Sequence, residues 1–211
     1  MKSIIHNIRN KGLIMFGILS ILIVFSSCDL SLQKDHDYES ETLDPHVYMT
    51  AWEYMQTRPD VFSSLIIALE YTGLDTYYKQ TDKKYTFLAL NNTAIDTYKS
   101  ATTGSSKTEI TDLDKDELTK MLKYHIIEGE YSSYGQLPVE PIFVLNLLRG
   151  DEDGLMTILV RKNPWQADAG KIIINDTGTN GNSPMRSAKT SNIIPINGVI
   201  HVFENYCYYK P

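Results

Sequence analysis

Hydrophobic side chains recur at intervals of three and four residues in segment 61–74, and this spacing predicts a helix with one apolar face. Asp60 precedes the segment and is expected to cap the helix. Gly73, followed by a leucine, is typical of a Schellman stop. An earlier helix is expected over residues 45–58, ended by Pro59, because the residue before a proline avoids the helical region.

A clear helical pattern also covers residues 112–127, where one face carries Leu118, Met121, Leu122 and His125. Asp114 and Glu117 have the spacing of a capping box at its start. Between these helices, residues 83–90 are expected to form a strand. A further helix is expected to follow, with Asn91 or Asn92 as its cap.

Beyond Gly129 the pattern changes to strands. The apolar segments 142–149, 155–162 and 170–176 are predicted strands, and a turn is predicted over residues 150–154. Residues 199–203 alternate in the manner of a core strand, and Asn197-Gly198 before them favours a tight reversal. Helices come mostly first and strands mostly later, which favours an α+β fold over a wound parallel sheet.

The chain begins with the features of a secretory signal. Residues 1–12 carry three basic side chains and no acid, and residues 13–25 carry no charge. Thirteen residues rise about 20 Å as a helix, short of the roughly 30 Å of a hydrocarbon core. A removed signal peptide over residues 1–27 therefore explains the segment better than a spanning helix.

Ser26-Ser27-Cys28 resembles a bacterial lipobox, although Phe25 stands where leucine is usual. This resemblance implies that Cys28 becomes lipidated and anchors the protein to a membrane, where more than one acyl chain gives stable attachment. Cys207 is the only other cysteine, so the lipidated chain would hold no intramolecular disulfide. An ordinary signal peptide with a chance cysteine is the alternative.

Residues 28–44 are rich in acids and are expected to form a solvated, flexible tether before a domain over residues 45–211. The tether resembles the acidic export segment of Bacteroides-type surface lipoproteins, which implies an outer-membrane anchor facing the cell exterior. Asp29 favours the opposite location, because an aspartate directly after the cysteine favours inner-membrane retention in enterobacterial lipoproteins. We favour the outer-membrane interpretation.

The chain of 211 residues has a formal net charge of −6, which argues against nucleic acid as a partner. It contains no phosphate-binding, dinucleotide-binding, zinc-protease or serine-hydrolase motif. Without such motifs, no catalytic residues and no cofactor are predicted. The five histidines are too scattered to name a set of metal ligands, so no metal site is predicted. Aromatic residues near the ends of predicted elements are expected either to stack on a ligand or to pack the ring in the core with the hydroxyl in water. These residues are Tyr77, Tyr78, Tyr131, Tyr134, Trp165, Tyr206, Tyr208 and Tyr209.

Three motifs follow one another along the domain, over residues 85–95, 122–131 and 192–204. Their characteristic positions are Thr86, Phe87, Asn92 and Ala94 in the first motif, Leu122, Tyr124, His125 and Gly129 in the second, and Asn197, Gly198 and His201 in the third. In content and order these motifs resemble those of the fasciclin (FAS1) domain family.

The resemblance implies a wedge-like β-sandwich with several helices packed against it, and adhesion or matrix binding without a common enzymatic activity. In animal members the Tyr-His segment has been linked to integrin binding, and Tyr124 and His125 occupy its place here. We interpret both signature histidines as structural, because a buried histidine can satisfy backbone groups that burial leaves open. Loops between residues 130 and 190, around Trp165 and over Asn175–Pro184, are expected to contact a particular partner.

The leading hypothesis is therefore a surface-anchored binding module. One version assists a TonB-dependent outer-membrane transporter and its SusD-like lipoprotein in capturing glycans or peptides. The other mediates adhesion to host matrix, glycan or neighbouring cells. A structural surface-layer component and a hydrolase with an unrecognised carboxylate pair are the alternatives from other classes.

Overall fold

A computed structural model describes residues 44–134, 137–148, 154–163, 166–176 and 183–208. The predicted signal peptide, Cys28 and all of the predicted tether except Asp44 lie outside these residues. Most of the predicted turn over residues 150–154 also lies outside them. No helix within the described ranges is long and apolar enough to cross a membrane.

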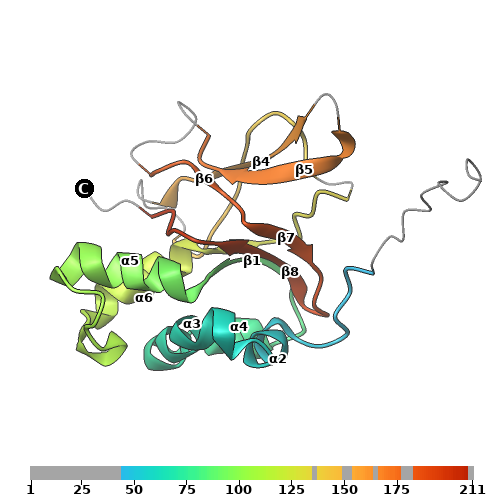
Figure 1. Cartoon of the computed structure of the whole chain (residues 1–211). Coiled ribbons are helices and arrows are strands. Elements are labelled where there is room, and N and C mark those ends of the chain that lie inside the picture. Colours follow the sequence, from blue (N-terminus) through green and yellow to red (C-terminus); the bar gives the residue numbers. More distant parts are fainter. Residues whose placement is uncertain (1–43, 135–136, 149–153, 164–165, 177–182, 209–211) are drawn as a thin grey trace, which may run out of the picture. The chain divides into compact units, whose positions relative to one another are not determined.

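The first of two four-stranded sheets has the order β2-β1-β8-β7 (Figure 1). At its centre lie β1 (Tyr85–Leu90) and β8 (Gly198–Phe203), and every residue of both strands is buried. These two strands run parallel, with Tyr85 opposite Gly198 and Leu90 opposite Phe203. The antiparallel neighbours β2 (Ile126–Glu128) and β7 (Thr190–Ile193) form the edges.

The second sheet is an antiparallel meander in the order β3-β4-β5-β6. Its strands are β3 (Ile142–Phe143), β4 (Thr157–Asn163), β5 (Gln166–Ile174) and β6 (Arg186–Ser187). The chain passes directly from β6 into β7 of the first sheet, and the backbone N–H of Ala188 donates to Ile172 on the way. The two sheets are thereby joined at one corner of the sandwich.

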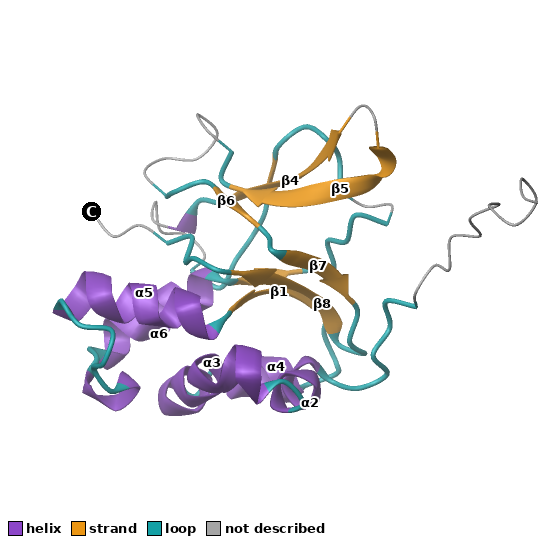
Figure 2. Ribbon diagram, in the orientation of Figure 1, coloured by secondary structure: helices purple, strands orange, loops and turns teal. Residues whose placement is uncertain are grey.

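Helices cover the face of the first sheet opposite the second sheet (Figure 2). They are α2 (Ala51–Gln56), α3 (Pro59–Thr72), α4 (Asp75–Lys79), α5 (Asn92–Thr103), the short 3₁₀ helix η2 (Ile110–Asp112) and α6 (Lys115–Tyr124). With layers on both of its faces, the centre of the first sheet lies in the core, which explains why β1 and β8 are buried along their whole length. The predicted α+β class, with helices packed against a β-sandwich, is confirmed.

Two predictions at the start of the domain are wrong. The predicted helix over 45–58 begins only at Ala51, because Pro45 and Val47 pair their backbones with Ile194. Thr50 caps it in a capping box with Glu53, a Thr-x-x-Glu signal that the sequence carries. Asp60 does not cap α3.

Arg58 holds the N-cap position of α3 instead, and Pro59 is the first helical residue. Proline suits that position because its missing N–H would be unpaired there in any case. Asp60 lies in the first turn, where its negative charge favours the helix N-terminus, and its carboxylate lies 3.0 Å from the Arg58 guanidinium. The proline therefore begins α3, whereas α2 has already ended at Gln56 with Thr57 as its C-cap.

Three other predictions of helix ends are confirmed. Gly73 adopts a positive φ of 77°, and the backbone N–H groups of Gly73 and Leu74 donate to Glu70 and Leu69, the pattern of a Schellman motif. Asn91 caps α5 by accepting from the Ala94 N–H at 2.9 Å. The Asp114 carboxylate caps α6 by accepting from two backbone N–H groups.

The predicted strand over 142–149 is confirmed only at its start, since β3 ends at Phe143. The chain then leaves the second sheet and bonds to the first, where the N–H of Glu128 donates to Leu145 and that of Leu147 donates to Ile126. An apolar run that serves two sheets in turn cannot form one straight strand. The predicted strands over 155–162 and 170–176 correspond to β4 and β5.

Gly198 sits where the chain turns from β7 into β8, and its φ of 149° is one that side chains with a Cβ rarely adopt. A Cβ at this position would lie 1.8 Å from the carbonyl oxygen of Tyr85 on β1. Glycine is therefore required for conformation and for the close approach of two central strands.

We expect Gly198→Ala to lower the free energy of unfolding by more than about 3 kcal/mol, because the methyl group must displace β1 backbone. Gly104→Ala is the matched control: Gly104 also has a positive φ, but nothing lies within 4 Å of its added Cβ. That variant should lose only about 1 kcal/mol from strain. Urea unfolding of both proteins measures the difference, and equal losses would contradict the close approach.

Candidate functional site

The signature residues on β1 are part of the buried core. The Thr86 hydroxyl donates to the Gly129 carbonyl at 2.8 Å and accepts from the Tyr131 N–H at 2.9 Å, so a side chain with no exposed surface fixes the loop after β2. Phe87 stacks on the ring of Tyr78 with their centroids 4.2 Å apart. Neither side chain is available to a ligand.

Asn92 joins the first turns of two helices. Its side-chain oxygen accepts from the backbone N–H of Ser64 at 3.0 Å, and its amide donates to the Asp60 carbonyl at 3.1 Å. The start of α5 is thereby tied to the start of α3. Ala94 is fully buried in the first turn of α5.

Tyr124 and His125 close the C-terminal end of α6. The Tyr124 hydroxyl donates to the Leu155 carbonyl at 2.7 Å. The His125 Nδ1 lies 2.7 Å from the Met121 carbonyl oxygen, while its Nε2 accepts from the Cys207 N–H at 2.9 Å. Because the carbonyl can only accept and the N–H can only donate, Nδ1 carries the proton and both ring nitrogens are occupied.

The polar side chains of the third motif also make hydrogen bonds in the interior. The Asn197 side chain accepts from the Ala51 N–H at 2.8 Å and donates to the carbonyls of Tyr78 and Gln80. It thereby joins the start of α2 and the end of α4 to the turn before β8. The His201 Nε2 lies 2.8 Å from the Tyr131 carbonyl oxygen, and its Nδ1 accepts from the Asn192 N–H at 3.2 Å.

Both signature histidines are held neutral. Burial lowers the pKa of His125 to about 4 and that of His201 to about 4, and the hydrogen bond to a backbone carbonyl opposes only part of this shift. A general base needs a free nitrogen within reach of a substrate proton. With both nitrogens bonded to backbone and no exposed surface to speak of, neither histidine has that geometry.

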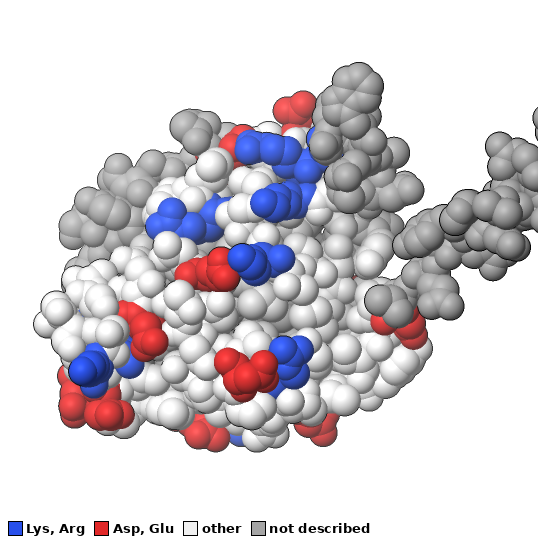
Figure 3. Space-filling view, viewed as in Figure 1, with Lys and Arg blue, Asp and Glu red and all other residues white. Residues whose placement is uncertain are grey.

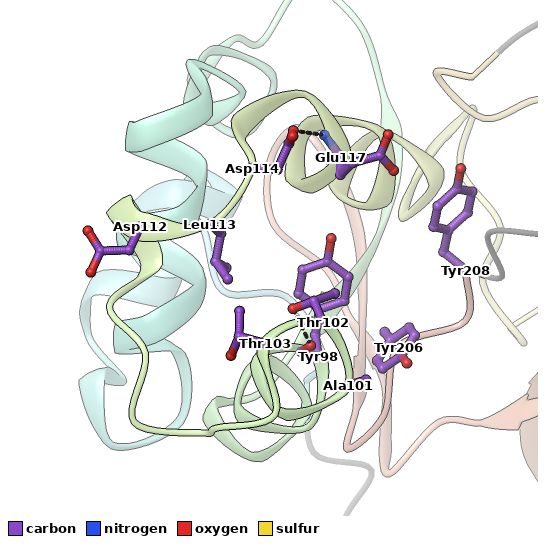
Figure 4. Close-up of a pocket in the computed structure, with 10 residues that line it drawn as sticks. All are labelled: Tyr98, Ala101, Thr102, Thr103, Asp112, Leu113, Asp114, Glu117, Tyr206 and Tyr208. Carbon is purple, nitrogen blue, oxygen red and sulfur yellow. Dashed lines mark hydrogen bonds between the residues drawn. The ribbon is translucent and has the colours of Figure 1, made fainter.

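An open pocket of about 460 Å³ lies at the other end of α6. Its walls come from three separate parts of the chain (Figure 4): α5, the segment from η2 into the first turn of α6, and the C-terminal segment after β8. The ten lining residues are Tyr98, Ala101, Thr102, Thr103, Asp112, Leu113, Asp114, Glu117, Tyr206 and Tyr208. This volume is within the range of small-molecule sites, which is about 300–1,000 Å³.

Tyrosine rings form the inner wall of this pocket, and carboxylates form its rim. The rings of Tyr98 and Tyr206 meet edge to face with centroids 5.4 Å apart. Burial and the nearby Glu117 carboxylate raise the pKa of the Tyr98 phenol. Acidic side chains also predominate over the helical layer in the view of Figure 3, whereas Lys and Arg side chains gather over the second sheet.

Sequence reasoning named Tyr206 and Tyr208 as candidates for ligand stacking, and the structure places both in this pocket. It missed Tyr98, Asp114 and Glu117 as pocket residues. Nothing in the sequence signals that α5 and the C-terminal segment, about 100 residues apart, share one wall.

The other aromatic candidates are placed elsewhere. Tyr78 is buried in the core and Tyr134 is exposed, while Trp165 and Tyr209 lie outside the described residues. Within those residues, no group of three or more His, Cys, Asp or Glu side chains is placed to hold a metal ion. The strands of the second sheet lie within the 130–190 segment that was predicted to carry partner loops, with Phe143 exposed on β3 and Leu145 exposed just after it.

We expect the protein to lose stability as the pH falls from 6.5 towards 4. Both histidines have folded pKa values of about 4, below the unfolded value near 6.5, so unfolded chains bind more protons in this window. The loss should reach roughly 1 kcal/mol per pH unit for each histidine. Urea unfolding between pH 6.5 and 5, above the range where carboxylates titrate, measures it, and a flat profile would exclude buried neutral histidines.

Comparisons with known proteins agree on one family. The profile of the fasciclin domain matches residues 60–206, more than half of the chain. The chain is also similar in structure to "a FAS1 Domain Pair from the Insect Cell Adhesion Molecule Fasciclin I", with a TM-score of 0.54 and 14% sequence identity. That match covers 77% of this chain and 51% of the other, so this chain spans about half the length of the insect structure. No curated protein matches the chain by sequence.

At this low sequence identity, the structural match to the insect protein shows the fold alone. The profile match shows the family. Fasciclin domains are adhesion-type binding modules, which agrees with a binding role for this chain. The three motifs, their order and the interior bonds made by their polar side chains all belong to one domain. The chain is a member of the fasciclin (FAS1) domain family.

Proposed function

We propose that the protein is a lipid-anchored binding module on the outer face of the outer membrane, where it assists a TonB-dependent transporter and a SusD-like lipoprotein in capturing glycans or peptides. The observation that supports the binding role is that polar side chains of the domain fall into two groups. Those of the signature are committed to interior hydrogen bonds, while an open pocket is lined by tyrosines and acids. Such a pocket suits recognition of a ligand.

The anchor and the location rest on the sequence. Residues 1–27 have the order of a lipoprotein signal, Cys28 follows the small residues of a lipobox-like stretch, and an acidic segment separates it from the folded domain. We expect the predicted tether over residues 28–44, as a flexible coil, to span about 20–25 Å. The tether thus leaves the domain free to reach a partner beside its anchor.

Adhesion is the second candidate function. The structural similarity to an insect cell adhesion molecule favours it. In this version the same anchored domain contacts host matrix, glycan or a neighbouring cell instead of a transporter. The two versions share the anchor and the binding role and differ in the partner.

The anchor is tested by metabolic labelling with an alkyne-bearing palmitate analogue. We expect the wild-type protein to take up label and to sediment with outer membranes, and Cys28→Ser to lose both properties because it lacks the acylated thiol. Cys207→Ala is the control, since Cys207 is fully buried and burial raises the pKa of its thiol to about 12. Labelling of Cys28→Ser at the wild-type level would contradict the anchor.

The partner is tested by affinity capture of the native protein from outer membranes solubilised in a mild detergent. We expect a TonB-dependent transporter and a SusD-like lipoprotein among the captured proteins, identified by mass spectrometry. Capture from cells that express Cys28→Ser provides the background, because that variant should not share the membrane with the transporter. Recovery of the wild-type protein without any transporter would exclude the uptake role and leave adhesion as the function.

A further inference from the structure

One polar group in the pocket has no partner in the described part of the chain. Tyr98 is only 7% exposed, and its hydroxyl makes no hydrogen bond with any described residue. Figure 4 shows this hydroxyl pointing from α5 towards Asp114 and Glu117 at the start of α6, across the pocket. A buried hydroxyl without a partner costs free energy. A ligand in the pocket would supply the missing hydrogen bond.

The charges around this hydroxyl favour a cation. Three of the ten lining side chains are carboxylates, and none of the ten is Lys, Arg or His. Asp114 uses one carboxylate oxygen to cap α6, and its other oxygen accepts no hydrogen bond from the described residues. Lys120 pairs with Glu117 at 3.4 Å and offsets part of one charge. The carboxylate of Asp112 is turned outward at the rim (Figure 4). It does not point into the pocket, but its charge adds to the negative potential at the pocket entrance.

The tyrosine rings favour the same class of ligand. A cation close to a tyrosine ring is attracted by the ring quadrupole, by about 0.5–2 kcal/mol depending on how far it is desolvated. The rings of Tyr206 and Tyr208 also offer apolar surface to an aliphatic stem. A ligand that uses every part of the pocket therefore joins a positive head that carries N–H groups to a short apolar chain.

We propose that this pocket binds a primary alkylammonium group, with N–H donors directed at the Tyr98 hydroxyl and the Asp114 carboxylate and its stem against Tyr206. A lysine side chain of a peptide and a free aliphatic amine share this chemistry. The proposal rests on the binding role proposed above, and it names the chemical class that this role recognises. It does not depend on the lipid anchor or on the transporter.

Binding is measured by isothermal titration calorimetry on the full chain, purified in a non-ionic detergent. The first probe is Nα-acetyl-lysine methylamide. Its Nε-acetyl and Nε-trimethyl derivatives test the charge and the N–H donors separately, because the first is neutral and the second keeps the charge without a donor. We expect the primary amine to bind at least about tenfold more tightly than either derivative, since each loses about 1.5 kcal/mol or more of interaction.

Further probes distinguish the two sources of the amine. A peptide with a central lysine and an aliphatic diamine are compared with the single amino-acid probe. Tighter binding of the peptide assigns the site to a protein partner, and tighter binding of the diamine assigns it to a small molecule. Binding of neutral oligosaccharides together with no measurable binding of any of the amines would overturn the proposal while leaving the binding role intact.

Tyr98→Phe is the decisive variant. It removes the hydroxyl and keeps the ring, so we expect affinity for the primary amine to fall about five- to tenfold. Its melting temperature should stay the same or rise, because the hydroxyl has no described partner to lose. Unchanged affinity in Tyr98→Phe would overturn the proposal.

Tyr78→Phe is its matched control. The Tyr78 hydroxyl is also buried without a hydrogen bond to a described residue, but this residue stacks on Phe87 in the core and does not line the pocket. Its amine affinity should equal that of the wild type. A fall equal to that of Tyr98→Phe would overturn the assignment to the pocket.

Asp114→Asn tests the charge without removing the helix cap, because asparagine caps a helix about as well as aspartate. We expect it to weaken binding of the primary amine at least about threefold and to leave binding of the neutral Nε-acetyl derivative unchanged. Equal effects on both probes would show that the charge is not recognised and would overturn the proposal.

Discussion

The parallel pairing of β1 with β8 is the constraint on which the rest of the structure depends. Two strands that are far apart in the sequence lie side by side in the core, with helices on one face and a second sheet on the other. Their register begins where Gly198 approaches Tyr85 too closely for any Cβ. Asn197, one residue earlier, holds α2 and α4 against the same turn through three buried hydrogen bonds. A single Asn-Gly pair therefore sets both the sheet and the helical layer.

Helix α6 connects the buried polar residues of the signature to the pocket. At its C-terminal end, His125 accepts a hydrogen bond from the backbone of Cys207 and fixes the segment that follows β8. Tyr206 and Tyr208 flank this anchor point and form one wall of the pocket. At its N-terminal end, Asp114 and Glu117 form the opposite rim. The histidine does not contact a ligand, but it places two of the rings that can.

The sequence predicted elements whose signals are local and failed where distant contacts decide. The Schellman stop at Gly73 and the cap at Asp114 depend on neighbours a few residues away, and both were predictable. Residues 45–50 pair with the segment before β8 instead of extending a helix, and no local pattern reveals such a pairing. The pocket is harder still, since its three walls meet only after the fold is complete. Tyr206 was a candidate from its place near a predicted element end, whereas no local pattern distinguishes Tyr98 from the other positions of α5.

Tyr98 differs from the polar residues of the signature in what its burial achieves. Thr86, His125 and His201 lose contact with water and gain backbone partners, so each one stabilises a specific approach of two segments. Tyr98 is also buried, at 7% exposed, yet its hydroxyl has no described partner and faces an open pocket with a carboxylate rim. Phenylalanine would pack the same ring without that cost, so stability alone does not explain the hydroxyl. The hydroxyl therefore contributes to binding a ligand in the pocket. The negative charge of the rim favours a cationic ligand.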